Sequence, residues 1–422
     1  MSTQGVFDCI VIGRGLMGAA AARHLQQSGW TVLAIGPDEP QPDRLEESTV
    51  FASHYDQARV LRQLGQDDDW TWLNTQAMKG FETLQRQSGT QFCHPVGSLY
   101  VSPQQDDPYF SQLPSASEQH QIPYTIYEDA DALHKAFPSF HFVSSSKGML
   151  EGAPAGHIHP RMLVKAQMKV FTEAGGSIVN NVASSVRSID KEKVVTCLDG
   201  SSYRAKNVLV AAGLFSHFMD LLPGTLDVVL ESETIILAEV TPQIADEMKT
   251  LPSLLYEIDE PLFNGVYLIR PLQYPDGRYY LKMGCNLEGD QFFTSLDEIK
   301  RWFVKGDSEA QHHLLREVLA LVMPTLPIVS SRTGRCAIVR TAHRKPFIGQ
   351  VDDGLFLTMG GNGYGAMCSD GLGFVASTLV QTGRLPEGLE PLLRHHLHRC
   401  AVCELNAALE CERLSDGTDV DA

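Results

Sequence analysis

The sequence has no long hydrophobic run and a deficit of positive charge. No apolar stretch reaches about 18 residues, so we expect no helix that crosses a membrane. Acidic residues outnumber basic ones by 51 to 34, giving a net charge of −17. This surplus repels phosphate backbones and anionic lipids, so we expect neither nucleic acid nor a membrane surface as partner.

Regular cysteine spacings, repeats and low-complexity linkers are also absent. The nine cysteines are scattered from Cys9 to Cys411, which indicates reduced thiols rather than a disulfide framework. The N-terminal segment has no basic region typical of a signal peptide, and the C-terminal residues form no obvious targeting signal. A cytoplasmic location is therefore expected. The 422 residues are enough for two or three domains.

A strand–turn–helix–strand pattern stands at the start of the chain. The apolar run Phe7–Ile12 leads into a G-x-G-x-x-G turn, an alanine-rich helical stretch and a second apolar run at 31–35. In such a turn Gly13 permits the tight bend, Gly15 lets the backbone approach a pyrophosphate, and Gly18 lets the helix pack on the strand. The pattern predicts a dinucleotide site.

The acidic residue that usually ends the second strand and holds a ribose is missing. Gly36 follows Ile35, and the nearest acid is Asp38. We therefore expect the ribose to be contacted either by Asp38 or by backbone groups. The glycine turn by itself does not distinguish FAD from NAD.

Two more apolar runs end in glycine, at 207–212 and 354–359, and a helical stretch follows the second at 371–382. Between the junctions lie β-rich segments, including a hairpin with its turn at 275–277. We therefore expect an α/β fold whose nucleotide-binding domain is assembled from separated segments. The expected boundaries are 1–90, 150–225 and 325–390 for this domain, 91–149 and 226–324 for a substrate domain, and 391–422 for a C-terminal helix and tail.

Several segments from Phe7 to about Leu385 resemble, in the same order, the FAD-dependent amine oxidases typified by monomeric sarcosine, N-methyltryptophan and pipecolate oxidases. These belong to the D-amino acid oxidase superfamily. The segments are Ser53-His-Tyr-Asp-Gln-Ala-Arg59-Val-Leu-Arg62, Leu281-Lys282-Met-Gly284, Arg335-Cys336-Ala-Ile-Val-Arg-Thr341 and Met359-Gly-Gly361-Asn-Gly363-Tyr364-Gly365. The resemblance implies a Rossmann-type FAD-binding domain with an inserted mixed β-sheet substrate domain, similar to p-hydroxybenzoate hydroxylase.

The resemblance also implies catalytic roles for three cations. Arg59 would lie beside the flavin, Arg62 would grip a substrate carboxylate, and Lys282 would activate oxygen. A guanidinium fork suits a carboxylate, and a lysine stabilises developing negative charge on oxygen. The alternatives are two surface arginines on one helix face and a solvated lysine at the end of the hairpin.

Cys336 resembles the cysteine that forms a thioether to the flavin ring in this family. The five-residue step to Thr341 agrees with the family pattern, although one extra residue precedes Phe347. The alternative is an inert buried cysteine. The cofactor-binding set expected in all is Gly13, Gly15, Leu16, Met17, Gly18, Asp38, Ser53, His54, Arg59, Val182, Gly213, Cys336, Gly361, Asn362, Gly363, Tyr364 and Gly365.

The chain departs from the family at three substrate-site positions. Gly365 stands where the family has a second carboxylate-binding lysine, Leu268 (next to Tyr267) replaces a substrate-facing tyrosine, and Asn286 replaces a histidine. The substrate is therefore not expected to be sarcosine. The candidate pocket residues are Arg62, Tyr267, Leu268, Asn286, Tyr364 and Gly365.

The expected reaction is oxidation of a secondary or N-substituted amine or amino acid by FAD and molecular oxygen. An imine, or its hydrolysis products, and hydrogen peroxide would form, and the resemblance favours a monomer. No acid–base residue stands out, and none is needed if the amine binds neutral. The alternatives are an amine dehydrogenase with another electron acceptor and a non-catalytic flavoprotein. His396, Cys400 and Cys403 share one face of a possible C-terminal helix, but an amphipathic helix explains them better than a metal site, and no metal is expected.

Overall fold

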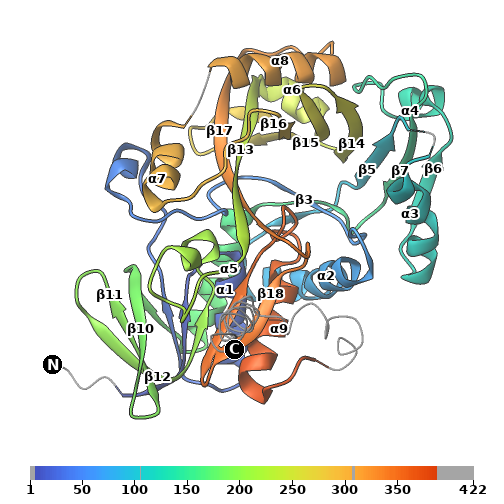
Figure 1. The fold of residues 1–422 in the computed structure, drawn as a ribbon. Helices are drawn as coiled ribbons and strands as arrows, with labels where there is room; N and C mark the ends of the chain where they lie inside the picture. Colours follow the sequence, from blue (N-terminus) through green and yellow to red (C-terminus); the bar gives the residue numbers. More distant parts are fainter. Residues whose placement is uncertain (1–4, 105, 307–308, 387–422) are drawn as a thin grey trace, which may run out of the picture.

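The computed structural model describes residues 5–104, 106–306 and 309–386, which form two eight-stranded sheets and one three-stranded sheet (Figure 1). The first sheet lies in the lower half of Figure 1 and the second in the upper half. The small sheet has the order β3-β8-β4. Its strands are β3 (Arg59–Leu61), β4 (Cys93–His94) and β8 (Gly156–Ile158).

The first sheet has a parallel core with the order β19-β12-β1-β2-β9. The antiparallel strand β18 extends it beyond β19, and the hairpin β10–β11 pairs with the first half of β12. Its strands are β1 (Phe7–Ile12), β2 (Val32–Ile35), β9 (Ser177–Val179), β10 (Ala183–Ile189), β11 (Glu192–Cys197), β12 (Ser202–Val210), β18 (Phe347–Asp352) and β19 (Leu355–Met359).

Four helices pack on one face of this sheet and on one another: α1 (Leu16–Gln27), α2 (Asp68–Ser88), α5 (Pro160–Glu173) and α9 (Ser369–Thr382). The small residues of α1 and α9 allow these two helices a close approach. A Cβ atom on Gly373 would lie only 2.5 Å from the Cβ of Ala20. The alanine-rich composition of α1 therefore serves helix packing, and α1 is held firmly behind the glycine turn.

The second sheet has the order β17-β13-β16-β15-β14-β5-β7-β6. Its outer face packs against α8 (Glu309–Val322) in a separate hydrophobic core. The strands are β5 (Ser98–Ser102), β6 (Tyr124–Tyr127), β7 (Lys147–Glu151), β13 (Val228–Val240), β14 (Ser253–Glu260), β15 (Phe263–Gln273), β16 (Tyr279–Leu287) and β17 (Ser330–Thr341). The remaining elements are α3 (Pro108–Gln119), α4 (Ala130–Ala136), α6 (Pro242–Glu247), α7 (Leu296–Lys305), η1 (Pro42–Glu47) and η2 (Gly213–His217).

The expected mixed α/β fold and the expected hairpin are confirmed. β15 and β16 pair antiparallel, and Gly277 takes φ +81° in the turn between them. The expected domain boundaries differ from the strand pairing at more than one place, and β7 crosses the boundary expected between residues 149 and 150. Residues 330–341 were expected in the nucleotide-binding domain, but they form β17 at the edge of the second sheet. Residues 391–422, with His396, Cys400 and Cys403, lie outside the described residues.

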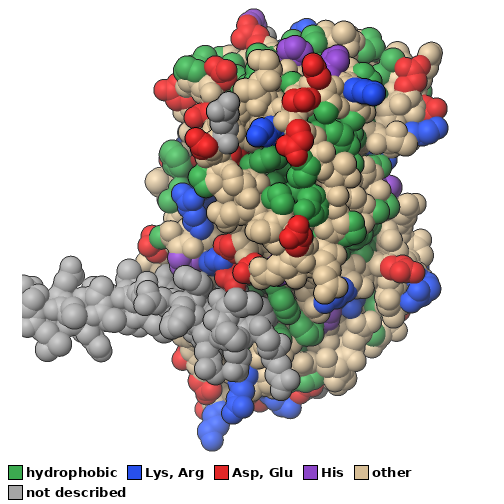
Figure 2. Space-filling view, turned by 90° about the vertical axis from the view of Figure 1, so that its right-hand side faces the viewer, with side chains coloured by type: hydrophobic (Ala, Val, Ile, Leu, Met, Phe, Trp, Pro, Cys, Tyr) green, Lys and Arg blue, Asp and Glu red, His purple; other side chains and the backbone are tan. Residues whose placement is uncertain are grey.

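Acidic and basic side chains are interspersed over the face of the molecule shown in Figure 2. Of the helices in the described ranges, none has both the length and the hydropathy needed to cross a bilayer. In the same ranges, no cluster of three or more histidine, cysteine or acidic side chains has a geometry that could hold a metal ion.

Candidate cofactor site and active site

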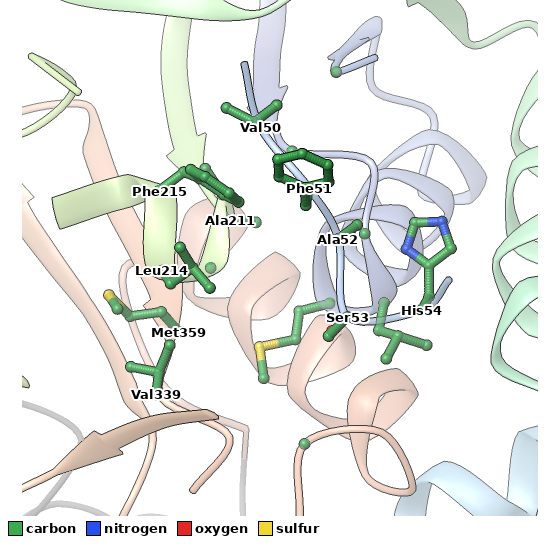
Figure 3. Close-up of a pocket in the computed structure, with 18 of the residues that line it drawn as sticks. Val50, Phe51, Ala52, Ser53, His54, Ala211, Leu214, Phe215, Val339 and Met359 are labelled. Atoms are coloured by element: carbon green, nitrogen blue, oxygen red, sulfur yellow. The ribbon is translucent and has the colours of Figure 1, made fainter. Parts of the chain in front are cut away.

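A cavity opens at the carboxyl ends of β1, β2, β12 and β19, where parallel α/β sheets bind their ligands. Val50 to His54 line one side of it, and Ala211, Leu214, Phe215, Val339 and Met359 face them across the open space (Figure 3). Of the expected cofactor-binding residues, the following line the cavity: Gly13, Gly15, Leu16, Met17, Ser53, His54, Arg59, Val182, Gly213, Cys336, Gly361, Asn362, Gly363 and Gly365. The chain thus brings most of that set together from distant segments.

The glycine turn is shaped for close backbone approach. Gly13 has φ +103°, and a Cβ there would lie 2.4 Å from the carbonyl oxygen of Ala211. A Cβ on Gly18 would lie 1.9 Å from the carbonyl oxygen of Gly13, so the helix and the turn pack backbone to backbone. At Gly15, the N-cap of α1, a Cβ would meet no atom within 4 Å. Open space therefore remains at the amino end of α1.

The amino end of α1 suits a phosphate group. Its first turn carries no acidic side chain, so its free amides and the positive end of its dipole are available to an anion. Nearby, the Nδ1 atom of His54 is buried and has no hydrogen-bond partner in the described part of the chain. Burial, together with Arg161, Arg14 and Arg59, lowers the pKa of His54 to about 3, so its ring is neutral. A polar ligand in the cavity would satisfy this nitrogen, and the residues present fit a dinucleotide such as FAD.

Asp38 lies beside the cavity rather than in its wall. Its exposed carboxylate accepts hydrogen bonds from Arg14 Nη2, at 2.7 Å, and from Asn180 Nδ2. Arg14 also donates from Nε to the carbonyl oxygen of Gly36, at 2.7 Å. Of the two alternatives for the ribose contact, Asp38 is therefore outside the cavity wall, whereas Gly36 and Pro37 line the cavity.

The last glycine-rich junction closes the opposite side of the cavity. Gly360 and Gly363 have φ +85° and +86°, and Asn362 has φ +49°. The side chain of Asn362 is fixed because its Oδ1 accepts a hydrogen bond from the backbone amide of Thr341, at 2.9 Å. Gly365 packs so closely on Gly361 that a Cβ on it would lie 3.0 Å from the neighbouring Cα, which leaves no room for the family's lysine without rearrangement.

Lys282 and Arg59 meet at one carboxylate, that of Asp56, and Cys336 lies next to Arg59. Lys282 is 2% exposed, and its Nζ donates to Asp56 Oδ2, at 2.6 Å, and to the carbonyl oxygen of Ala58, at 3.0 Å. Arg59 donates to the same Asp56 oxygen and lies 3.4 Å from the sulfur of Cys336. Asp56 belongs to the motif that suggested the arginines, but sequence reasoning gave it no role.

The charges in this cluster depend on one another. Burial alone would raise the pKa of Asp56, but Lys282 and Arg59 hold it well below its usual range. Burial and the neighbouring Arg59 lower the pKa of Lys282, and Asp56 opposes that shift. Lys282 and Asp56 therefore form a buried ion pair of an ammonium group and a carboxylate, which the second sheet shields from water.

Arg62 lies in a cage of three tyrosines. It is 3% exposed, and its Nη1 donates to the hydroxyls of Tyr100, at 2.7 Å, and Tyr109, at 2.5 Å. Its guanidinium carbon is 5.1 Å from the ring centroid of Tyr100 and 5.6 Å from that of Tyr364. Its Nε is buried without a hydrogen-bond partner, and no ion pair joins Arg62 to an acid of the described ranges. Sequence reasoning missed Tyr100 and Tyr109, which no motif marks.

Tyr364 does not line the cavity but contacts Trp70 edge to face, at 5.5 Å between ring centroids, besides facing Arg62. Gly18 and Tyr364 therefore support the cavity from behind. Asn286 is exposed and donates a hydrogen bond of 2.7 Å to Asn264. Leu268 was expected in the substrate pocket, but it is fully buried in the core beneath the outer face of the second sheet.

The alternation of side chains along β15 explains why Tyr267, and not Leu268, faces the site. Side chains at successive positions point to opposite faces, so Leu268 enters the core and Tyr267 faces the site. The ring of Tyr267 lies 5.6 Å from Lys282 Nζ. Tyr267 is thus the residue of this pair that the structure brings to the catalytic cluster.

Comparison with known proteins agrees with this geometry. The sequence profile of the family described as FAD dependent oxidoreductase (DAO) matches residues 8–379. N-methyl-L-tryptophan oxidase of Yersinia pestis (strain Pestoides F) is 26% identical over 222 residues, which is 52% of this chain and 57% of that protein. The matched region thus spans little more than half the length of this curated relative.

Two solved structures share the fold. NikD, an unusual amino acid oxidase essential for nikkomycin biosynthesis, has a TM-score of 0.72 and 18% identity over 92% of this chain and 97% of that one. Glycine oxidase from Geobacillus kaustophilus has a TM-score of 0.70 and 16% identity over 92% and 98% of the two chains. At these identities the likeness concerns the fold alone.

Proposed function

Because the chain belongs to the family of FAD-dependent oxidoreductases, we propose that it oxidises a secondary or N-substituted amine or amino acid with molecular oxygen as electron acceptor. The observation that carries this proposal is the cluster of Lys282, Asp56 and Arg59 beside Cys336, at one end of a cavity built for a dinucleotide. When bound, FAD supplies the two-electron oxidation of the C–N bond and passes the electrons to oxygen.

FAD would be held along the cavity by backbone groups. The turn at Gly13 to Gly18 and the amino end of α1 would bind the pyrophosphate. The junction at Gly361 to Gly363 would offer its backbone to the flavin end. His54 would present its unpartnered Nδ1 to the cofactor.

The side chains of the second sheet and of β3 would supply electrostatics. Lys282 keeps a positive charge beside the reaction zone and would stabilise negative charge that develops on oxygen. Asp56 fixes the position of that ammonium group and of Arg59. Arg62 would bind a substrate carboxylate, because no direct ion pair within the described ranges engages its buried charge and its Nε is unsatisfied.

We further propose that the sulfur of Cys336 carries the flavin as a thioether. In support, Cys336 lines the cavity and is only partly buried, and the carbonyl of the same residue accepts a hydrogen bond of 2.9 Å from Trp302 Nε1, which fixes the backbone there. The cysteines of the described ranges are free thiols, which supports a cytoplasmic location. A monomeric state is proposed on the family resemblance.

A flavin-dependent amine dehydrogenase is the second candidate. Asp56 and Ala58 already engage two of the three N–H groups of Lys282, which leaves one donor for an oxygen species or a water molecule. In a dehydrogenase Lys282 would serve only to hold the ion pair with Asp56, and a quinone or a protein would take the electrons.

Anaerobic mixing of the purified yellow protein with a panel of N-methyl amino acids, cyclic amino acids and simple secondary amines tests the function. We expect at least one of them to bleach the flavin absorbance, and admission of oxygen to restore it with one equivalent of hydrogen peroxide. Bleaching without rapid recovery in oxygen would identify a dehydrogenase instead. Protein that is folded and yellow but is bleached by none of the amines would contradict both.

A further inference from the structure

A buried acid, Glu233, faces the site from β13 and has no part in the function proposed above. Its side chain is 7% exposed, and its carboxyl group lies near the hydroxyl of Tyr267 on β15. In the pairing of β13 with β17, Glu233 lies directly opposite Cys336. The carboxyl group is therefore on the face of the sheet that carries the cavity-lining sulfur.

Tyr267 links this acid to the catalytic cluster. Its ring lies over Gly284, where a Cβ would come within 2.6 Å of the tyrosine hydroxyl. The absence of a side chain at Gly284 thus makes the room that Tyr267 occupies. The ring is held between Lys282 Nζ, 5.6 Å from its centroid, and the carboxyl group of Glu233. Tyr267 is only partly buried, so it is the member of the pair that a substrate can reach.

Charged and titratable groups surround the pair of Glu233 and Tyr267 from every neighbouring strand: Lys282 and Cys285 on β16, Asp290 after β16, Cys336 and Arg340 on β17, and Asp56 and Arg59 near β3. Arg340 is already engaged by Glu231, and Lys282 by Asp56. Burial and the negative charge of Asp290 outweigh these cations and raise the pKa of Glu233 to about 7. The group can therefore gain and lose a proton near neutral pH, as a general base must.

Amine oxidation needs such an acceptor when the substrate arrives as an ammonium ion. The nitrogen lone pair must be free to form the C=N bond as the neighbouring C–H bond breaks, so the extra proton on nitrogen has to leave first. We propose that Tyr267 and Glu233 together accept this proton, with Tyr267 in contact with the substrate nitrogen and Glu233 as the final acceptor. This inference rests on the proposed function and adds an acid–base step to it.

The transfer balances without any other reactant. The ammonium proton passes to the hydroxyl oxygen of Tyr267 while the tyrosine's own proton passes to the carboxylate of Glu233. A neutral amine, a neutral tyrosine and a protonated Glu233 result, and no electrons move. Asp56 would be a poor proton acceptor in place of Glu233, because Lys282 and Arg59 hold its pKa well below its usual range.

The test compares holoenzyme with Glu233→Gln, Tyr267→Phe and a control, Glu239→Gln, which changes an acid on the same strand that pairs with Arg278. Anaerobic stopped-flow reduction of the flavin by N-methyl-L-tryptophan is followed across neutral pH. For the wild type we expect the reduction rate divided by Kd to rise with pH up to an inflection near 7, where Glu233 becomes ionised. Glu233→Gln should remove the inflection and slow reduction by about 10²- to 10⁴-fold at neutral pH. The control variant Glu239→Gln should keep both the inflection and the wild-type reduction rate.

A second readout needs no turnover. The absorbance of bound flavin, titrated with pH without substrate, should show the same ionisation in the wild type and lose it in Glu233→Gln. If the glutamine variant does not bind flavin, Tyr267→Phe carries the test, since it removes only the hydroxyl and should lower the reduction rate and shift the inflection. An inflection and rate that survive either substitution would overturn the inference and leave the amine oxidase function intact. A wild-type flavin that no amine reduces would instead overturn the function, and the inference with it.

Discussion

The ammonium group of Lys282 lies 2.6 Å from the Oδ2 atom of Asp56, and the guanidinium of Arg59 donates to the same oxygen. One buried acid thus sets the positions of two cations that come from different sheets. The cation expected to act on oxygen and the cation expected beside the flavin are therefore not independent. A substitution of either cation therefore changes the position and the electrostatic environment of the other through Asp56.

Replacing Lys282 with methionine should separate the two halves of the reaction. We expect reduction of the flavin by an amine to change little, while its reoxidation by oxygen slows by about 10²-fold, because one preorganised charge is lost. Double-mixing stopped flow measures both rates on the same sample. The exposed Lys249 provides the matched control, Lys249→Met. Unchanged oxygen reactivity in Lys282→Met would exclude an oxidase role for this lysine.

Replacing Asp56 with asparagine should weaken the fold as well as the site. Breaking a buried ion pair costs about 3–5 kcal/mol, whereas Asp246→Asn, at an exposed pair with Lys249, should cost less than about 1 kcal/mol. Urea unfolding measures both. In the double variant Asp56→Asn/Lys282→Met the losses should be less than additive, since the second change removes the charge that the first leaves unpaired.

The same pair predicts a pH dependence of stability. The pKa of Asp56 is depressed in the folded protein, so its contribution is present above the pKa of an unfolded aspartate, about 3.9, and is lost as the pH falls through the acid range. The free energy of unfolding of the wild type should therefore fall more steeply below about pH 4 than that of Asp56→Asn. Parallel curves for the two proteins would mean that Asp56 is not ionised in the folded state.

Replacing Cys336 with serine should release the flavin on acid precipitation. In the wild type we expect the yellow colour to stay in the pellet, whereas in Cys336→Ser it should move to the supernatant. Cys93→Ser, at another partly buried thiol, is the control and should behave as the wild type. Colour released from the wild type would leave the flavin site in place and make Cys336 an ordinary residue of β17.

Replacing Arg62 with glutamine should weaken binding of substrates that carry a carboxylate. A hydrogen bond to a charged group contributes about 1.5–3 kcal/mol, which corresponds to about 10- to 100-fold in Kd. Spectral titration with an N-methyl amino acid and with its neutral amide makes the comparison. The amide should bind the variant and the wild type alike. An equal loss for both ligands would point to collapse of the tyrosine cage around Arg62 instead.

Local patterns in the sequence predicted the cofactor cavity well, because its walls are built from turns. A glycine turn between a strand and a helix has few alternative geometries, so Gly13 and Gly15 could be placed from their spacing. The junction at Gly361 to Gly363 was placed by its resemblance to the last glycine-rich junction of the family. The hairpin around Gly277 was predictable for the same reason. In each case the residues that matter are close together along the chain.

The substrate side could not be predicted in this way, because it depends on contacts between distant strands. Leu268 and Tyr267 differ by one position, and only the register of β15 decides which of them faces the site. Glu233 reaches the site through the pairing of β13 with β17, about a hundred residues farther along the chain. Tyr100 and Tyr109 surround Arg62 without any motif that marks them.

The place of Cys336 on the second sheet affects how the cofactor is retained. The glycine turns that would hold the rest of FAD belong to the first sheet, whereas β17 belongs to the second. A thioether at Cys336 would tether the cofactor to one sheet while the other binds it reversibly. If the two halves separated, the tethered flavin would still face its glycine turns at an effective concentration on the order of millimolar. Rebinding would then be independent of the concentration of free FAD in the surroundings.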